Sequence, residues 1–113
     1  MIDIHFSFDK ESITSVEMSG HAESGAYGQD IVCAAVSALS IGTVNSLVEI
    51  AGIPIDVVSA DKQGGYLKFS LPEHVDDKQM ETAQILLSSL LLSLKQTEDE
   101  YGEYLTINSS YRK

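Results

Sequence analysis

Residues 30–54 read DIVCAAVSALSIGTVNSLVEIAGIP, a long apolar run between a helix start signal and a helix stop signal. Asp30 stands at a typical N-cap position, and Gly52 followed by Pro54 is typical of a helix end. We therefore expect a helix from about Ile31 to Ala51, capped by Asp30. Because its apolar side chains cover most of the circumference, the pattern predicts a central, buried helix.

The segments on either side of this helix alternate between apolar and polar residues, as β-strands do. Before the helix, Ile2 to Phe8 and Ile13 to Met18 predict an antiparallel hairpin. After the helix, Ile55 to Ser59 and Tyr66 to Leu71 flank a short polar turn and predict a second hairpin.

A second helix is expected after Asp76, which forms a capping-box pattern with Gln79. Its apolar face is wider than one small core needs, and this excess predicts a subunit interface and a homodimer, although a helix fully covered within one chain would show the same pattern. Residues 104–109 then alternate like a last strand. The expected order is β-β-α-β-β-α-β, a two-layer α+β fold with two helices packed on one sheet.

Length and composition favour one domain over residues 1–113. A chain of 113 residues is too short for two independent cores, and 43% hydrophobic with 21% charged residues is ordinary for a globular protein. The single cysteine excludes an internal disulfide framework. The most leucine-rich run, residues 85–94, is about half of a membrane crossing, and the first residues do not resemble a signal sequence. We expect a cytoplasmic protein without a membrane partner.

The charge balance restricts the class of partner. The chain has 17 acidic and 7 basic residues, a formal net charge of -10, and no cluster of Lys or Arg. Such a chain is a poor ligand for a phosphate backbone, so no direct nucleic-acid partner is expected. The negative charge instead favours encounters with basic peptides or basic proteins.

One segment combines a nucleophile with a base. His21 follows the second predicted strand, a glycine-containing loop follows His21, and Cys33 falls in the first turn of the predicted helix. Free backbone N–H groups and the helix dipole favour a thiolate there and can bind an oxyanion. The dipole contributes only about 0.3–1 kcal/mol, whereas ionising a thiol near neutral pH takes roughly 2 kcal/mol. An imidazolium from His21 can supply the remainder, so we predict a Cys-His dyad.

Neighbouring residues keep alternative roles. Asp30 either caps the helix or turns toward His21 and orients its ring. Ser37, four residues after Cys33, lies on the same helix stripe and can donate to the thiolate or to substrate. Taken alone, however, a single cysteine in an apolar helix is usually a buried, inert residue. The spacing by itself leaves that reading open.

Metal and nucleotide chemistry fit the sequence poorly. His21-Ala22-Glu23 matches the H-x-E pattern of zinc deaminases, but the C-x-x-C that must accompany it is absent. Gly25 and Gly28 lack the spacing of a phosphate-binding loop and have no neighbouring Lys or Arg. We therefore expect no metal and no cofactor.

The same segment resembles the ribosomal-processing cysteine protease family, Prp. The resemblance is most specific at residues 19–22, SGHA, and at residues 28–37, GQDIVCAAVS. It implies that His21 is the general base and Cys33 the nucleophile. The family's supporting glycine, aspartate and serine match Gly20, Asp30 and Ser37. A homodimer and a loop that closes over substrate are further family features.

The resemblance also implies an activity and a partner. Members of the family remove a short N-terminal extension from the precursor of large-subunit ribosomal protein twenty-seven during ribosome assembly. In the implied mechanism His21 takes the thiol proton, Cys33 attacks the scissile carbonyl, helix-start N–H groups hold the oxyanion and water releases the acyl-enzyme. The loop of residues 22–29 would close the peptide groove, with Tyr27 packed on an apolar substrate side chain.

Two other functions stay open at this point. In the first, the protein is a non-catalytic ribosome-assembly or peptide-binding module, in which Cys33 merely packs and acidic surface binds basic protein. In the second, a small thioester or amide hydrolase uses the same dyad on metabolites. A Cys33→Ser variant separates binding from catalysis, because it abolishes turnover and leaves a binding function intact.

Overall fold

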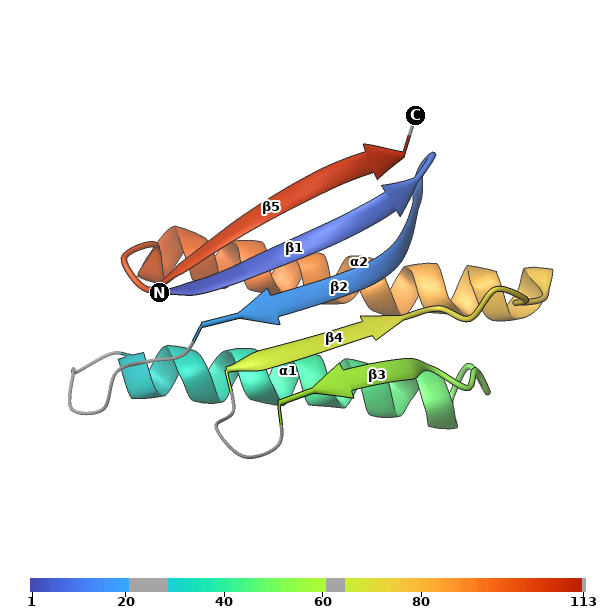
Figure 1. The fold of residues 1–113 in the computed structure, drawn as a ribbon, viewed down its shortest axis with the longest axis horizontal. Helices are drawn as coiled ribbons and strands as arrows, with labels where there is room; N and C mark the ends of the chain where they lie inside the picture. The colour runs from blue at the N-terminus through green and yellow to red at the C-terminus, as the bar shows by residue number, and fades with distance from the viewer. Residues whose placement is uncertain (21–28, 61–64, 113) are drawn as a thin grey trace.

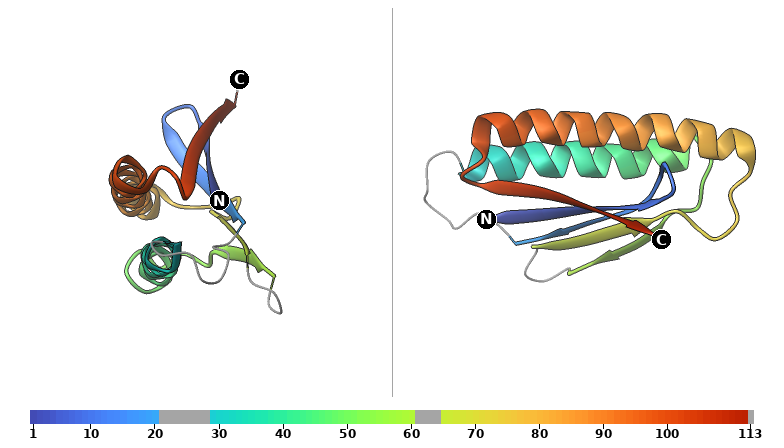
Figure 2. Two further views of the ribbon diagram at one scale, coloured as in Figure 1. Left: turned by 90° about the vertical axis from the view of Figure 1, so that its left-hand side faces the viewer. Right: turned by 90° about the horizontal axis from the view of Figure 1, so that it is seen from above.

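The computed structural model describes residues 1–20, 29–60 and 65–112. The predicted order of elements is confirmed: β1 (Ile2–Asp9), β2 (Ser12–Ser19), α1 (Gln29–Glu49), β3 (Asp56–Ser59), β4 (Tyr66–Ser70), α2 (Asp77–Tyr101) and β5 (Leu105–Arg112). The strands form one five-stranded sheet, and α1 and α2 lie side by side on one face of it (Figures 1 and 2). The predicted two-layer α+β class is confirmed.

The sheet joins the two predicted hairpins through their inner strands. Its strand order is β3-β4-β2-β1-β5, and neighbouring strands are antiparallel except for β1 and β5, which are parallel. After α2 crosses back over the sheet, β5 adds next to β1 (Figure 1). β3 and β5 are therefore the two edge strands.

The core lies between the sheet and the helices. Alternate residues of β1 and β2 point toward the helices, and α2 meets them with a stripe at helical spacing. The buried residues of β1 are Ile2, Ile4 and Phe6, and those of α2 are Ala83, Leu87, Leu90 and Leu94. Both hairpins and both helices thus share one hydrophobic cluster.

The capping box predicted for the second helix is present. The Asp76 side chain accepts a hydrogen bond from the Gln79 backbone N–H at 2.7 Å, and the Gln79 side-chain oxygen accepts from the Asp76 N–H at 3.1 Å. These two bonds satisfy backbone donors that the helix itself leaves unpaired. The signal is local in sequence, which is why it could be read without the fold.

The first helix is shifted by two residues from its predicted bounds at both ends. α1 begins at Gln29 and ends at Glu49, whereas the sequence predicted a helix from about Ile31 to Ala51. Asp30 is therefore the second residue of the helix and not its N-cap, and Cys33 is the fifth helical residue and not the third. A carboxylate is favourable throughout the first turn of a helix. An acidic residue in the sequence therefore locates the first residue of the helix only to within one turn.

The prediction that this helix is the central, buried helix of the fold is also wrong. Val32, Val36 and Leu47 join the core, but Ile31 and Ile41 on other sides of the helix are 49% and 55% exposed. By length and composition alone, residues 31–49, with a mean hydropathy of 1.9, are apolar enough to cross a membrane. A helix that packs in the core of a soluble protein passes the same test, because hydropathy does not reveal which side is covered.

Candidate active site

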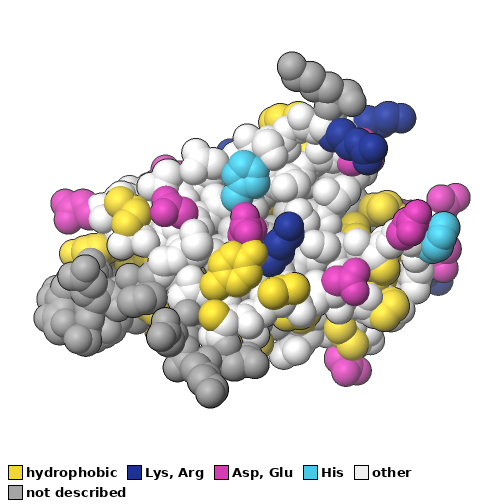
Figure 3. All heavy atoms as spheres, in the orientation of Figure 1, with side chains coloured by type: hydrophobic (Ala, Val, Ile, Leu, Met, Phe, Trp, Pro, Cys, Tyr) yellow, Lys and Arg dark blue, Asp and Glu magenta, His cyan; other side chains and the backbone are white. Residues whose placement is uncertain are grey.

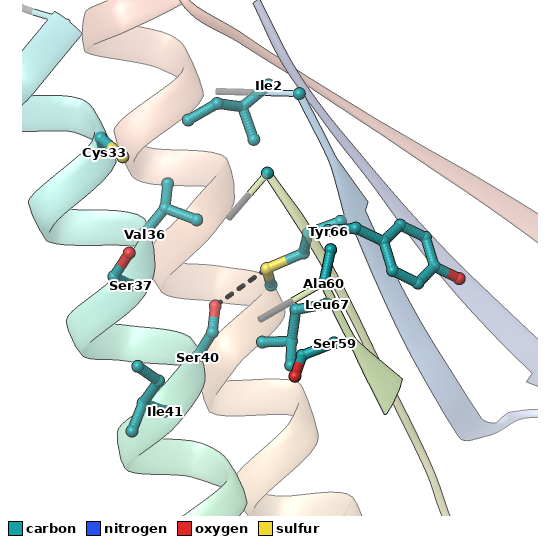
Figure 4. A pocket seen from close by; sticks show the side chains of 13 residues that line it. Ile2, Cys33, Val36, Ser37, Ser40, Ile41, Ser59, Ala60, Tyr66 and Leu67 are labelled. Carbon is teal, nitrogen blue, oxygen red and sulfur yellow. Dashed lines mark hydrogen bonds between the residues drawn. The ribbon is translucent and has the colours of Figure 1, made fainter. Parts of the chain in front are cut away.

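A cavity of about 450 Å³ opens between the first half of α1 and one end of the sheet (Figure 4). The antiparallel register brings the start of β1, the end of β2, the end of β3 and the start of β4 to this end. The lining residues are Cys33, Val36, Ser37, Ser40 and Ile41 from α1, and Ile2, Met18, Gly20, Ser59, Ala60, Gly65, Tyr66 and Leu67 from the sheet side.

Cys33 lies at one end of this cavity, one turn into α1 (Figure 4). Its thiol is free, and the half-buried side chain packs against the core. Cys33 is the fifth residue of α1, so it directly follows the first turn of the helix. Backbone N–H groups in that turn have no acceptor within the helix, and they can hold a developing negative charge.

Gly20 is the last described residue before His21, and it also lines the cavity. Its φ is +91°, a left-handed conformation that favours glycine. A Cβ at this position would overlap the backbone carbonyl oxygen of Met1, and the Gly20 N–H donates to the Gly65 carbonyl at 2.9 Å. The residue before His21 therefore lies close to Met1 and is hydrogen-bonded to Gly65, just before β1 and β4, while the aiming of His21 stays a prediction.

The other predicted site residues divide into three groups. His21 and Tyr27 lie outside the described residues. Ser37 is exposed at the rim of the cavity, one turn after Cys33 as its spacing predicted. Asp30 is the second residue of α1, a position that argues against the N-cap role, and its alternative role as the orienter of His21 stays a prediction.

The floor of the cavity contains a polar residue that the sequence analysis missed. Ser40 is fully buried, and its hydroxyl donates to the Met18 thioether sulfur at 3.1 Å (Figure 4). A thioether is a weak acceptor, so this bond links α1 to β2 without strong directionality. Its signal was present, since Cys33, Ser37 and Ser40 recur at i, i+4 and i+7 in an otherwise apolar helix.

The wall opposite α1 was not identifiable from the sequence. Tyr66 borders the cavity, but its ring points away from it in Figure 4. The Tyr66 hydroxyl donates to the Glu17 carboxylate at 2.5 Å, and this hydrogen bond raises the pKa of Tyr66. No local pattern connects residue 66 with residue 33; the pairing of β4 with β2 brings them together.

The outer face of the sheet, opposite the helices, carries charges of both signs (Figure 3). Glu17 is paired across the strands with His5 on one side and Lys68 on the other. The His5 ring also hydrogen-bonds Ser110 at 2.8 Å. Within residues 1–20, 29–60 and 65–112, no three His, Cys, Asp or Glu side chains gather into a metal-binding cluster.

A cysteine beside a cavity and near unpaired helical N–H groups is the arrangement of a cysteine hydrolase, and a family model described as cysteine protease Prp matches residues 1–106. The ribosomal processing cysteine protease Prp of Bacillus subtilis is 36% identical over 107 residues, which cover 95% of this chain and 94% of the relative. The protein of the same description from Staphylococcus aureus is 36% identical over 100 residues, 88% of this chain and 90% of the relative.

Solved structures agree with these sequence comparisons. A crystal structure from Streptococcus mutans is similar with a TM-score of 0.88 and 37% identity, covering 99% of this chain and 96% of that chain. The Prp protease of S. aureus, in complex with a covalently linked product peptide, has a TM-score of 0.83 and 34% identity, with 97% and 100% coverage. The protein is a cysteine protease. It belongs to the ribosomal-processing cysteine protease Prp family, as the motifs around His21 and Cys33 had suggested.

Proposed function

We propose that this protein removes the N-terminal extension from the precursor of large-subunit ribosomal protein twenty-seven during ribosome assembly. One observation carries the proposal: Cys33, the single cysteine of the chain, lies at a cavity in a fold shared with processing proteases. The S. aureus relative has also been crystallised with a substrate peptide. Membership of this family favours the protease over a non-catalytic binding module.

In the proposed mechanism, a Cys33–His21 dyad cleaves one peptide bond in two steps. His21 accepts the thiol proton, and the Cys33 sulfur attacks the scissile carbonyl carbon. The protonated His21 then gives its proton to the leaving amine, which produces a thioester between Cys33 and the extension. In the second step His21 takes a proton from water, the hydroxide attacks the thioester, and the proton returns to the Cys33 sulfur.

The start of α1 supplies electrostatic stabilisation in this mechanism. The oxyanion formed by the attacked carbonyl accepts hydrogen bonds from backbone N–H groups of the first turn of α1, which directly precedes Cys33. Residues 22–29, which lead from His21 into the helix, close over the peptide, and Tyr27 packs on an apolar substrate side chain. Closure on a correct peptide would assemble the dyad and contribute specificity.

We further propose that the chain acts as a homodimer in the cytoplasm, where Cys33 stays reduced. The exposed side of α2 supports a dimer, because Ile85 and Leu92 are 65% and 60% exposed and flank a shallow hollow with Ser88 and Ser89. Sedimentation of the wild type against Leu92→Glu tests this interface. A dimer in the wild type and a monomer in the variant are expected, and a wild-type monomer would contradict the proposal.

The activity is tested by mass spectrometry of the extended ribosomal protein from the same organism after incubation with the reduced protease. We expect one cut near the N-terminus of the substrate, lost in Cys33→Ala and in His21→Ala. His74→Ala is the matched control, because His74 is an exposed histidine in the connection between β4 and α2. It should cleave like the wild type.

Each other outcome has a distinct meaning. An intact substrate after incubation with the wild type would overturn the processing assignment. Substrate that is bound but never cut would favour the peptide-binding module. Cleavage that survives in Cys33→Ala would remove the dyad from the mechanism.

A further inference from the structure

Strand β3 is an exposed edge of the sheet beside the active-site cavity. It pairs with β4 on one side, and Figures 1 and 2 show it at the free border of the sheet. All four of its residues are exposed, and its Val57 and Val58 side chains are 47% and 59% accessible. Ser59 and Ala60, where β3 ends, line the same cavity as Cys33.

The register shows which backbone groups of β3 point away from the sheet. The Ala60 N–H donates to the Tyr66 carbonyl at 3.2 Å, so residues 60 and 66 form a hydrogen-bonded pair. Hydrogen-bonded and non-hydrogen-bonded pairs alternate along an antiparallel ladder. The pair of Val58 with Lys68 lies two residues before the pair 60/66, so it is also hydrogen-bonded. The pair of Val57 with Phe69 is not, so the N–H and C=O of Val57 point outward. Val57 therefore presents a donor and an acceptor at the edge.

Such an edge fits one kind of partner, an extended peptide. Exposed edge strands with apolar side chains invite pairing with another strand, and folded proteins usually cover or blunt them. A peptide that adds to an edge gains affinity from backbone hydrogen bonds, which any sequence can make, while pockets read its side chains. Because β3 ends at the cavity wall, a peptide paired with β3 would run toward the cavity that Cys33 also lines.

We propose that the protease binds its substrate by β-augmentation: the polypeptide adds to the outer edge of β3 and exchanges two backbone hydrogen bonds with Val57. This inference rests on the proposed function for the identity of the substrate. The strand rise is about 3.3 Å per residue, so Val57 lies roughly 10 Å before Ala60, and the substrate residue that it binds is at least about three residues from the scissile bond. The edge thus supplies sequence-independent affinity, and the cavity supplies selectivity.

The proposal is tested first on the unmodified protease with a series of synthetic peptides. Each peptide spans the junction between the extension and the body of the ribosomal protein and has one backbone nitrogen methylated. One amide, on one side of the scissile bond and at least about three residues from it, is expected to donate to Val57. Methylation of that amide should lower kcat/KM roughly tenfold, which is the effect of one lost backbone hydrogen bond. Methylation of the next amide, which faces away from β3, should have little effect. Amides adjacent to the scissile bond are left out, because methylation there alters the chemistry itself.

A pair of protein variants tests the same contact from the other side. Val57→Pro removes the outward N–H without removing a hydrogen bond to β4, and proline is tolerated on an edge strand in that orientation. It should raise KM roughly tenfold, because a substrate carbonyl loses its donor, while methylation of the facing amide should lower kcat/KM further, because it removes the separate bond to the Val57 carbonyl. Val57→Ala, the matched control, keeps the N–H and should have nearly the wild-type KM. Circular dichroism of both variants checks that the fold is unchanged.

The possible results separate this inference from the proposed function. If the wild type does not cleave the unmethylated peptide, the processing function fails. If it cleaves but no distal amide is sensitive to methylation, or if Val57→Pro has wild-type KM, β-augmentation is wrong. A change in oligomeric mass in Val57→Pro without a change in KM would assign the edge to a second copy of the chain and would also overturn the proposal.

Discussion

The two helices cover the same face of the sheet, but within the described residues only α2 is hydrogen-bonded to the strands through side chains that bind their backbone, whereas α1 borders the cavity. α2 has a capping box, one buried stripe and two side chains that hydrogen-bond strand backbones. Gln84 binds both the N–H and the C=O of Ile13, at 2.7 and 2.8 Å, and Glu98 accepts from the Ile107 N–H at 2.8 Å. α1 is apolar over most of its circumference, is partly exposed, and borders the cavity with Cys33, Ser37 and Ser40.

α2 stabilises the sheet, whereas α1 forms one wall of the candidate active site. Ile13 lies next to the register shift between Ser7 and Phe8, where the pairing of β1 with β2 is irregular. Gln84 of α2 accepts a hydrogen bond from the Ile13 backbone N–H at this place. α1 instead leaves space between itself and the strand ends, and that space is the cavity. Substitutions in α2 should therefore change stability, and those at the cavity side of α1 should change activity.

The largest expected effect is on activity, at Cys33 of α1. Cys33→Ala should lower kcat/KM for the extended ribosomal protein by at least about a thousandfold, because it removes the nucleophile. The free energy of unfolding should change by less than about 1 kcal/mol, because the side chain is small and only half-buried. Peptide cleavage assays and urea unfolding measure the two quantities. Activity above a hundredth of the wild type would refute a role as nucleophile.

The largest expected effect on stability is in the stripe of α2. Leu94 is fully buried, and Leu94→Ala should lower the free energy of unfolding by about 2–5 kcal/mol. Ile41→Ala on α1, where the side chain is 55% exposed, should cost less than about 1 kcal/mol. Urea denaturation of both variants provides the comparison. Equal losses would mean that the exposed side of α1 is covered in solution.

A smaller loss is expected where α2 binds the backbone of β2. Gln84→Ala leaves the partly buried N–H and C=O of Ile13 without their side-chain partner, which should cost about 1–3 kcal/mol. Gln96→Ala, at an exposed position of the same helix, is the control and should be nearly neutral. Thermal unfolding followed by circular dichroism measures both. A neutral Gln84→Ala would show that water replaces the side chain at no cost.

The smallest effect is expected at the N-cap of α2. Asp76→Ala removes the acceptor for the Gln79 N–H and should destabilise the protein by about 1 kcal/mol. Asp77→Ala keeps the cap and removes only a favourable charge in the first turn, so its loss should be about 0.3–1 kcal/mol. Urea midpoints rank the two variants. A larger loss for Asp77→Ala would contradict the capping interpretation.

Sequence reasoning succeeded where the physical signal is local. The capping box of Asp76 and Gln79 spans four residues, and the alternation of Ile2, Ile4 and Phe6 spans five, so each pattern is complete within one element. The candidate site was likewise found from a short segment around Cys33. The cavity wall at Gly65 and Tyr66 could not be found, because it depends on strand pairing between residues far apart in the chain.

By itself, the sequence determined the element order, the capped helix α2 and the family to which the chain belongs. Periodicity, capping and motif spacing are properties of neighbouring residues, and the family follows from the pattern of residues along the chain. Only the tertiary structure decided the strand order, the exposed side of α1 and the opening of the cavity beside the edge strand β3. Hydrophobicity gives each element an apolar surface, but which part is buried depends on the elements that pack against it.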